Sequence, residues 1–300
     1  MVKKKGSIST GWRILWHIYR SPIARFIKPL RRAGVRSEIT RRRNLARGLV
    51  VLPKQQIHAE ELIQNGYAVV SDVMDPEITR SLSEAALEKH QRAQKVSVKQ
   101  VSSHKDFWTR LLDEDMQDGT LPTDSPFVTF ALQPAVLAIL ARAFGELPQL
   151  DYVLLTLSRN SDKALSYSQL WHRDHDDTRV IKLFVYLTDV LSLDDGPFTF
   201  IPGPASDRFG FSLRSHRSDK ALAGRVEAAE VTAMVAPRLS AFMVETSRCL
   251  HMGSRLSPGH ERLLYTATYT SVPRLLPEPP PRFRLTGCES DVVKCVLSAT

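Results

Sequence analysis

The chain has 300 residues, 43% of them hydrophobic and 24% charged, and its formal net charge is +9. This composition is ordinary for a globular protein with a sizeable core, and it excludes fibrous and broadly disordered classes. The three cysteines form no CxxC pair, which argues against a disulfide framework or zinc ribbon and suits a reducing compartment. No run of about 18 apolar residues and no secretory signal is evident, so we expect no membrane span.

Positive charge is concentrated in a predicted N-terminal arm, residues 1–50. Its first 47 residues contain fourteen Lys or Arg and one acid, Glu38. They therefore carry +13, and since the whole chain carries +9, the rest carries −4. A basic arm on a mildly acidic body differs from a nucleic-acid-binding domain with a basic face, so we expect no nucleic acid partner.

Apolar residues recur at helical spacing between Trp12 and Ile27, with basic residues largely between them, and Pro22 is expected to kink or divide this helix. The pattern favours peripheral contact of residues 8–47 with an anionic membrane. A mitochondrial transit peptide has a similar pattern. The remaining interpretation of this segment is a helix packed on the body or a disordered basic tail. The expected location is the cytoplasm, with peripheral membrane contact, or else the mitochondrion.

Helical patterns dominate the chain from about residue 57 to residue 144. The predicted helices cover residues 58–64, 77–94 and 134–144, with a short strand at 67–70. Residues 103–126 are polar and contain turn formers, so we predict a loop with a short helix around residues 107–112.

The second half of the chain is built from short runs rich in Val, Leu, Tyr, Phe and Thr. The predicted strands cover residues 151–157, 166–172, 180–187, 198–201, 239–245 and 263–269. Many short strands behind a few helices predict a mainly β, α+β fold, a barrel or jelly roll braced by helices. We expect this domain to span residues 55–275, followed by a C-terminal extension, residues 276–300, that starts with a stiff proline-rich stretch.

Polar residues are most concentrated at positions 171–177, directly after a predicted strand. At a strand end, side chains two residues apart point the same way, so His172 and Asp174 can bind one metal ion. His175 and Asp177 form a second His-x-Asp pair, which lies in the loop and is less favoured for that reason. A third ligand would complete the face of two histidines and one carboxylate that is typical of non-haem iron(II) oxygenases.

His251 is the expected third ligand, because it follows the predicted strand 239–245 after a short turn. Arg262 comes eleven residues later, at the start of the next predicted strand. A hairpin would place Arg262 beside His251 with its side chain inside the barrel. A buried guanidinium needs an anion, and the carboxylate of a ligand can accept two hydrogen bonds from it.

These residues resemble the phytanoyl-CoA dioxygenase (PhyH-like) family of Fe(II)/2-oxoglutarate-dependent oxygenases, from about residue 64 to residue 270. The similar segments are residues 65–70 with 75–77, 169–174, 185–190, 195–203, 251–254 and Arg262. Two departures stand out: Pro204 and Ala205 follow Pro202-Gly203 where the family often has Ser-His, and Gly253 replaces a frequent hydroxyl residue, with Ser254 next to it.

The resemblance implies a double-stranded β-helix (jelly-roll, cupin-like) core and a dioxygenase that uses Fe(II), 2-oxoglutarate and O2. His172, Asp174 and His251 would be the metal ligands and the catalytic residues. The far carboxylate of 2-oxoglutarate would pair with Arg262, and Gln169 or Lys182 would add a contact. Because related halogenases lack the carboxylate, Asp174 favours hydroxylation or desaturation of a C–H bond.

The sequence does not identify the substrate. The basic arm suggests a lipid or a lipid-linked glycan, and otherwise a small organic molecule. The alternative function is a non-catalytic binding or scaffold protein on the same fold, and a metal-dependent hydrolase or epimerase is a third. A test of whether turnover depends on 2-oxoglutarate would separate the dioxygenase from these alternatives.

Overall fold

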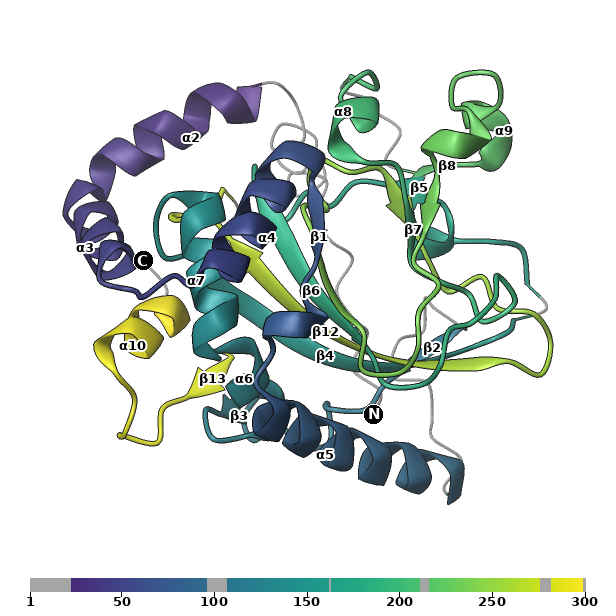
Figure 1. Ribbon diagram of the computed structural model, residues 1–300, viewed down its shortest axis with the longest axis horizontal. Helices are drawn as coiled ribbons and strands as arrows, with labels where there is room; N and C mark the ends of the chain where they lie inside the picture. Colours follow the sequence, from purple (N-terminus) through teal and green to yellow (C-terminus); the bar gives the residue numbers. More distant parts are fainter. Residues whose placement is uncertain (1–22, 96–106, 162, 211–215, 276–281, 299–300) are drawn as a thin grey trace, which may run out of the picture.

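The computed structural model describes residues 23–95, 107–161, 163–210, 216–275 and 282–298 (Figure 1). Two antiparallel β-sheets lie opposite each other, and helices cover the outer face of the larger sheet (Figure 1). This architecture confirms the predicted mainly β, jelly-roll-like core with flanking helices. None of the helices in these ranges is long and apolar enough to cross a membrane.

The larger sheet has six strands and the smaller sheet has five. In spatial order the larger sheet contains β1 (Tyr67–Val69), β10 (Ala241–Val244), β6 (Val180–Tyr186), β12 (Glu261–Thr270), β4 (Gln149–Arg159) and β2 (Trp108–Arg110). The smaller sheet contains β8 (His216–Arg217), β5 (Trp171–His172), β11 (His251–Met252), β7 (Thr199–Phe200) and β9 (Thr232–Ala233). From β4 to β12 the chain passes back and forth between the two sheets, with β7, β8 and β9 all in the smaller one, so residues far apart in the chain face one interior.

Side-chain alternation along β12 separates the hydrophobic core from the interior between the sheets. Tyr265 and Tyr269 are fully buried on the helical side, where their hydroxyls donate to the carbonyl oxygens of Phe127 and Ala131 at 2.5 and 2.7 Å. Alternate residues such as Arg262 face the other sheet. The helices on the outer side are α4 (Pro53–Asn65), α5 (Pro76–Lys95), α6 (Pro126–Ala131) and α7 (Pro134–Phe144).

Helices α2 (Ile23–Gly34) and α3 (Arg36–Arg47) pack on the body. The side chain of Arg42 is fully buried and donates to the carbonyl oxygens of Leu147, Pro148 and Cys295 at 3.2, 3.1 and 2.6 Å. These bonds compensate for the cost of burying the guanidinium. Residues 23–47 of the predicted arm are thus part of the folded domain, while residues 8–22 of the predicted membrane segment lie outside the described ranges.

The C-terminal extension also packs on the domain where it is described. Strand β13 (Phe283–Arg284) pairs in parallel with β3 (Leu121–Pro122), and α10 (Asp291–Leu297) contacts β4 and α3. The predicted boundary at residue 275 therefore does not separate two packed units.

Two local predictions were wrong. Residues 107–112 contain β2 and not a helix, because this segment pairs with the edge of β4, and Leu111 N donates to Leu155 O at 2.9 Å. Residues 166–172 form a 3-10 turn, η2 (Tyr167–Gln169), before the two-residue strand β5. The other short elements are η1 (Ser71–Val73), α8 (Gly203–Ser206), α9 (Asp219–Leu222) and η3 (Ala228–Glu230).

Candidate metal centre

A cavity of about 360 Å³ lies between the two sheets. Alternate residues of β4 and β12 form one wall, and residues of β5 and β11 form the opposite wall. Its polar lining includes His172, Asp174, Lys182, His251 and Arg262, and its apolar lining includes Leu154, Phe184, Phe198 and Leu264. The cavity is therefore lined by charged and polar side chains together with an apolar patch, which suits a small ligand that has polar and apolar parts.

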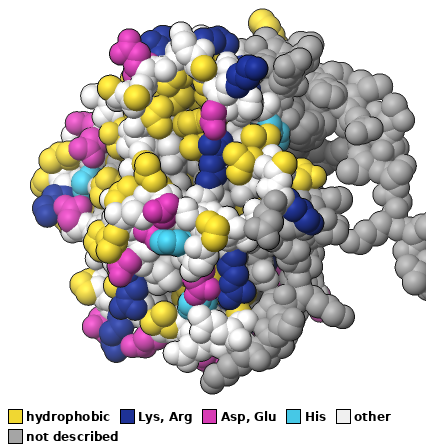
Figure 2. Space-filling model, turned by 90° about the vertical axis from the view of Figure 1, so that its right-hand side faces the viewer, with side chains coloured by type: hydrophobic (Ala, Val, Ile, Leu, Met, Phe, Trp, Pro, Cys, Tyr) yellow, Lys and Arg dark blue, Asp and Glu magenta, His cyan; other side chains and the backbone are white. Residues whose placement is uncertain are grey.

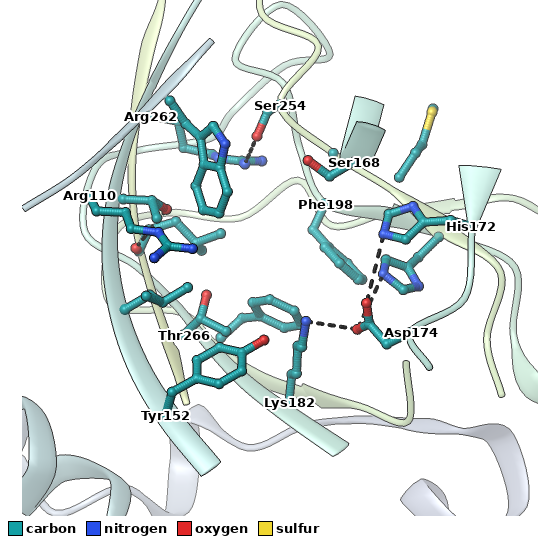
Figure 3. A pocket seen from close by; sticks show the side chains of 18 of the residues that line it. Arg110, Tyr152, Ser168, His172, Asp174, Lys182, Phe198, Ser254, Arg262 and Thr266 are labelled. Carbon is teal, nitrogen blue, oxygen red and sulfur yellow. Dashed lines mark hydrogen bonds and ion pairs between the residues drawn. The ribbon is translucent and has the colours of Figure 1, made fainter. Parts of the chain in front are cut away.

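The structure brings His172, Asp174 and His251 together on one side of the cavity (Figure 3). His172 and His251 are directly paired across β5 and β11, and Asp174 follows His172 by two residues. The Nε2 atoms of His172 and His251 lie 3.9 and 3.7 Å from the carboxylate oxygens of Asp174. One ligand atom from each residue lies within 4.8 Å of the others, so small side-chain movements are enough to bind one ion.

Both imidazoles are oriented by backbone carbonyls. His172 Nδ1 lies 2.8 Å from Leu170 O, and His251 Nδ1 lies 3.0 Å from Cys249 O. A proton on Nδ1 can donate to these oxygens, which leaves the Nε2 lone pairs directed at Asp174, as metal ligation requires.

The local electrostatics also fits a metal site. Burial and the neighbouring His251 lower the pKa of His172 to about 3. Burial likewise lowers the pKa of His251. Both rings are therefore neutral at physiological pH, the form that binds a metal.

Asp174 is held in its ionised form by its neighbours. Burial raises its pKa, but the ammonium group of Lys182 opposes that effect, and the pKa is lowered overall. Lys182 Nζ lies 2.8 Å from Asp174 Oδ2 (Figure 3). The carboxylate can therefore offer one oxygen to a metal ion while the other oxygen stays with the ammonium group.

The two further predicted contacts of 2-oxoglutarate have other partners in the structure. Lys182 lines the cavity, but its ammonium group is engaged by Asp174. Gln169 is buried outside the cavity lining, and its amide nitrogen donates to Ser254 O at 3.0 Å. Its side-chain oxygen accepts from Ser166 N at 3.2 Å. Gln169 thus joins two loops behind the cavity wall.

Arg262 is only 2% exposed and lies across the cavity from Asp174 (Figure 3). It is on β12 of the larger sheet and His251 is on β11 of the smaller one, so the two do not form the predicted hairpin. Its guanidinium donates to Ser254 Oγ at 2.8 Å and to Gly196 O, and burial lowers its pKa. In the described part of the chain no carboxylate forms an ion pair with it. A buried guanidinium without a paired carboxylate can bind an anion.

Ser254, noted in the sequence as the hydroxyl residue next to Gly253, lies beside Arg262, and its Oγ is 3.1 Å from Ser158 Oγ. Sequence reasoning missed two other cavity residues. Trp108 and Arg110 come from β2, in a segment that was predicted as a loop with a helix. Their polar surroundings in the sequence gave no indication of a cavity.

Solved structures with this fold include EctD and the epimerase SnoN. EctD from S. alaskensis with 2-oxoglutarate and 5-hydroxyectoine has a TM-score of 0.52 and 14% identity, covering 75% of this chain and 78% of that chain. The epimerase SnoN with Fe3+, alpha ketoglutarate and nogalamycin RO has a TM-score of 0.50 and 18% identity, covering 73% and 84%. The chain therefore shares its fold with these two proteins. The ligands named for these neighbours are consistent with the cofactors predicted here.

No family model matches the chain, and no curated protein matches it. The resemblance to the phytanoyl-CoA dioxygenase family therefore stays a prediction. At such low sequence identities the structural likeness establishes the fold, and the argument for function depends on the residues of the cavity.

Proposed function

We propose that this protein is an Fe(II)- and 2-oxoglutarate-dependent dioxygenase. The observation that supports the proposal best is the pairing of two sites in one cavity. Two oriented imidazoles and a carboxylate can hold iron on one side, and a buried arginine without an acidic partner among the described residues lies opposite (Figure 3). 2-Oxoglutarate is a dicarboxylate, so its 2-oxo acid end can bind the metal ion while its other carboxylate pairs with Arg262.

Each residue has a definable task in this function. His172 and His251 offer neutral nitrogens, and Asp174 offers the negative charge that offsets part of the charge of the metal ion. Arg262, which donates to Ser254 Oγ, would hold the far carboxylate of 2-oxoglutarate together with that hydroxyl. Iron(II), 2-oxoglutarate and O2, when bound, supply the oxidising chemistry.

Aromatic side chains exclude water beside the metal ligands. The ring of Phe198 stacks on His251 with centroids 5.3 Å apart, and Phe184 lies 4.5 Å from Phe198. A dry wall at this position strengthens the electrostatic interactions of the bound groups and limits side reactions.

Hydroxylation of a C–H bond is the reaction that we propose, since Asp174 occupies the position that related halogenases leave without a carboxylate. Because one structural neighbour is an epimerase, product analysis has to separate hydroxylation from epimerisation or desaturation. A non-catalytic binding protein on the same fold is the alternative, and it would not require 2-oxoglutarate.

Replacing Arg262 by Met should weaken 2-oxoglutarate binding at least tenfold. A hydrogen bond to a charged group contributes about 1.5–3 kcal/mol, and about 1.4 kcal/mol corresponds to a factor of ten. Anaerobic titration of the Fe(II) protein with 2-oxoglutarate measures the change. The matched control is Arg284→Met, an exposed arginine outside the cavity lining that should leave the affinity unchanged. Equal affinities in wild type and Arg262→Met would exclude this arginine as the anchor.

Peripheral contact with an anionic membrane, and with it a lipid or lipid-linked glycan substrate, is a second proposal. Its support in the described residues is the outer face of α2, where Phe26 and Leu30 are 75% and 74% exposed. They lie on one face of the helix, and Lys28 and Arg32, which contact the body, lie on the opposite one. Exposed large apolar side chains on a basic helix are typical of a membrane contact.

Changing Phe26 and Leu30 together to Ser should reduce binding to vesicles of phosphatidylcholine and phosphatidylglycerol by about tenfold or more. Each side chain would lose about 1.5–3 kcal/mol of apolar burial. Co-sedimentation measures the bound fraction, with vesicles of phosphatidylcholine alone as the neutral comparison. Leu285→Ser, at a residue that is 49% exposed, is the matched control. The proposal fails when wild type stays in solution with anionic vesicles, or when the double variant sediments as wild type does.

A further inference from the structure

The lining of the cavity carries more positive than negative charge. Among the residues that the structure describes there, the cations are Arg110, Lys182, Arg262 and Arg282, and the only carboxylate is that of Asp174. By contrast, basic and acidic side chains are interspersed on the coloured part of the outer face shown in Figure 2. The excess of positive charge is thus a local property of the cavity.

Three of the four cations have an identified partner. Lys182 is paired with Asp174 at 2.8 Å, and the proposed function assigns Arg262 to 2-oxoglutarate. Arg282 lies 5.3 Å from the centre of the Tyr152 ring, and its Nε is 3.8 Å from a carboxylate oxygen of Asp151. Arg110 is the remaining cation.

Arg110 projects into the cavity from the edge strand β2. It is directly opposite Thr156 of β4 in the strand register, and Thr156 also lines the cavity. Directly opposite residues lie on the same face of a sheet, so the side chain of Arg110 points inward, as Figure 3 shows. It is exposed to solvent, so it lies where the cavity opens.

No carboxylate in the described part of the chain forms an ion pair with Arg110, and the acidic group that its charge influences is Asp113, whose pKa it lowers against the larger, raising effect of burial. Its guanidinium lies 5.8 Å from the centre of the Trp108 ring, which leaves its hydrogen-bond donors available to a ligand. Arg110 lies across the cavity from His172 and Asp174 (Figure 3), and Trp108, two residues before it on the same strand, also lines the cavity.

Binding of Fe(II) and 2-oxoglutarate would not remove the excess positive charge of the cavity lining. The two charges of Fe(II) and the two charges of 2-oxoglutarate cancel, and so do those of Asp174 and Lys182. Arg110, Arg262 and Arg282 then remain positive, with Asp151 shared between Arg282 and Arg274. A cationic cleft with low-dielectric walls attracts anions and raises their local concentration.

We propose that the substrate is a small organic anion whose carboxylate or phosphate is bound by Arg110. This inference rests on the proposed function, since it assigns Arg262 to 2-oxoglutarate. The apolar part of the substrate packs against Leu154, Phe184 and Phe198, which places it near the metal ligands. The cavity volume of about 360 Å³ is close to the lower limit for small-molecule sites, about 300–1,000 Å³, and 2-oxoglutarate fills part of it.

The test compares an acid with its neutral isostere. Calorimetric titrations of 3-phenylpropionate, phenyl phosphate and 3-phenylpropionamide are run on anaerobic protein that is saturated with Fe(II) and 2-oxoglutarate. At least one of the two anions should bind wild type at least tenfold more tightly than the amide. Arg110→Met should remove that difference and leave both the amide affinity and the 2-oxoglutarate affinity unchanged. Arg284→Met is the matched control and should behave as wild type.

The outcomes separate this inference from the proposed function. If no anion binds wild type more tightly than the amide, or if Arg110→Met keeps the preference, the anionic substrate site is wrong. If Arg110→Met instead loses affinity for 2-oxoglutarate, Arg110 anchors the co-substrate and the inference is also wrong. If wild type binds no 2-oxoglutarate, the proposed function fails, and the same titrations on the metal-free protein still decide whether Arg110 recognises an anion.

Discussion

Asp174→Ala should lower the affinity for Fe(II) by more than about 100-fold. Changes to residues that merely support a metal ligand cost about 10–100-fold in affinity, and this change removes a ligand. The change also removes the carboxylate that lies 2.8 Å from the ammonium group of Lys182. That ammonium group then lies unpaired near the two neutral imidazoles. The uncompensated positive charge would repel a divalent cation. Anaerobic titration with Fe(II), with the bound metal measured after desalting, gives the affinity.

His175→Gln is the matched control, because His175 belongs to the second His-x-Asp pair of the same loop and is not one of the three clustered ligands. It should retain the metal affinity of wild type. Asp174→Ala/Lys182→Met should bind Fe(II) more tightly than Asp174→Ala alone, because it removes the repelling charge. If Asp174→Ala binds Fe(II) as wild type does, or if His175→Gln abolishes binding, the ligand assignment is wrong.

Lys28→Met should lower the free energy of unfolding by about 3 kcal/mol. Lys28 Nζ lies 2.7 Å from Asp177 Oδ1, and the side chain of Asp177 is completely buried. Burial lowers the pKa of Lys28 against the opposing effect of Asp177, so the charged pair depends on mutual compensation. Removing one partner of such a pair costs about 3–5 kcal/mol. Asp177 keeps hydrogen bonds from the backbone nitrogens of Ser271 and Leu275, which favours the lower value.

Urea unfolding measures this change, and Lys54→Met is its matched control. Lys54 Nζ lies 3.0 Å from Asp72 Oδ2, but both side chains are largely exposed, at 67% and 45%. Exposed pairs contribute about 0–1 kcal/mol, so this variant should unfold close to wild type. Equal losses of unfolding free energy in Lys28→Met and Lys54→Met would show that α2 does not stabilise the domain through Asp177.

Because Asp177 is three residues from Asp174, Lys28→Met should also weaken Fe(II) binding.

Some elements of the fold are determined by local sequence. The helix Pro134–Phe144 agrees with its prediction at both ends, because Pro134 suits a first helical position and Gly145 adopts a left-handed conformation, φ 73°, at the end. Strand β6 (Val180–Tyr186) was also predicted almost to the residue, since its long apolar run is buried on both faces.

Other elements depend on partners far away in the sequence. Strand β2 exists because residues 107–111 pair with the edge of β4, and nothing in its local composition indicates that pairing. All five strands of the smaller sheet have only two residues, which is too short to show alternation. In the sequence Arg42 is one of many basic residues of the N-terminal arm and nothing distinguishes it. In the structure its hydrogen bonds to Leu147 O and Cys295 O hold it inside the domain.

The site shows the same division between local and long-range information. The spacing of His172 and Asp174 carries its own geometric meaning, and the structure brings His251 to the same place. The role of Lys182 could not be read from the sequence, because Asp174 reaches it only when β5 and β6 lie in opposite sheets. Arg110 was missed because strand β2 forms only by pairing with β4, whose residues are far away in the sequence.

The central claim is that one cavity binds iron and 2-oxoglutarate together. The most direct measurement is the visible spectrum of oxygen-free protein to which Fe(II) and then 2-oxoglutarate are added. The chelate should give a weak metal-to-ligand charge-transfer band in wild type, which disappears in Asp174→Ala and weakens in Arg262→Met. A wild-type protein that binds neither iron nor 2-oxoglutarate would contradict the account and favour a non-catalytic binding protein on the same fold.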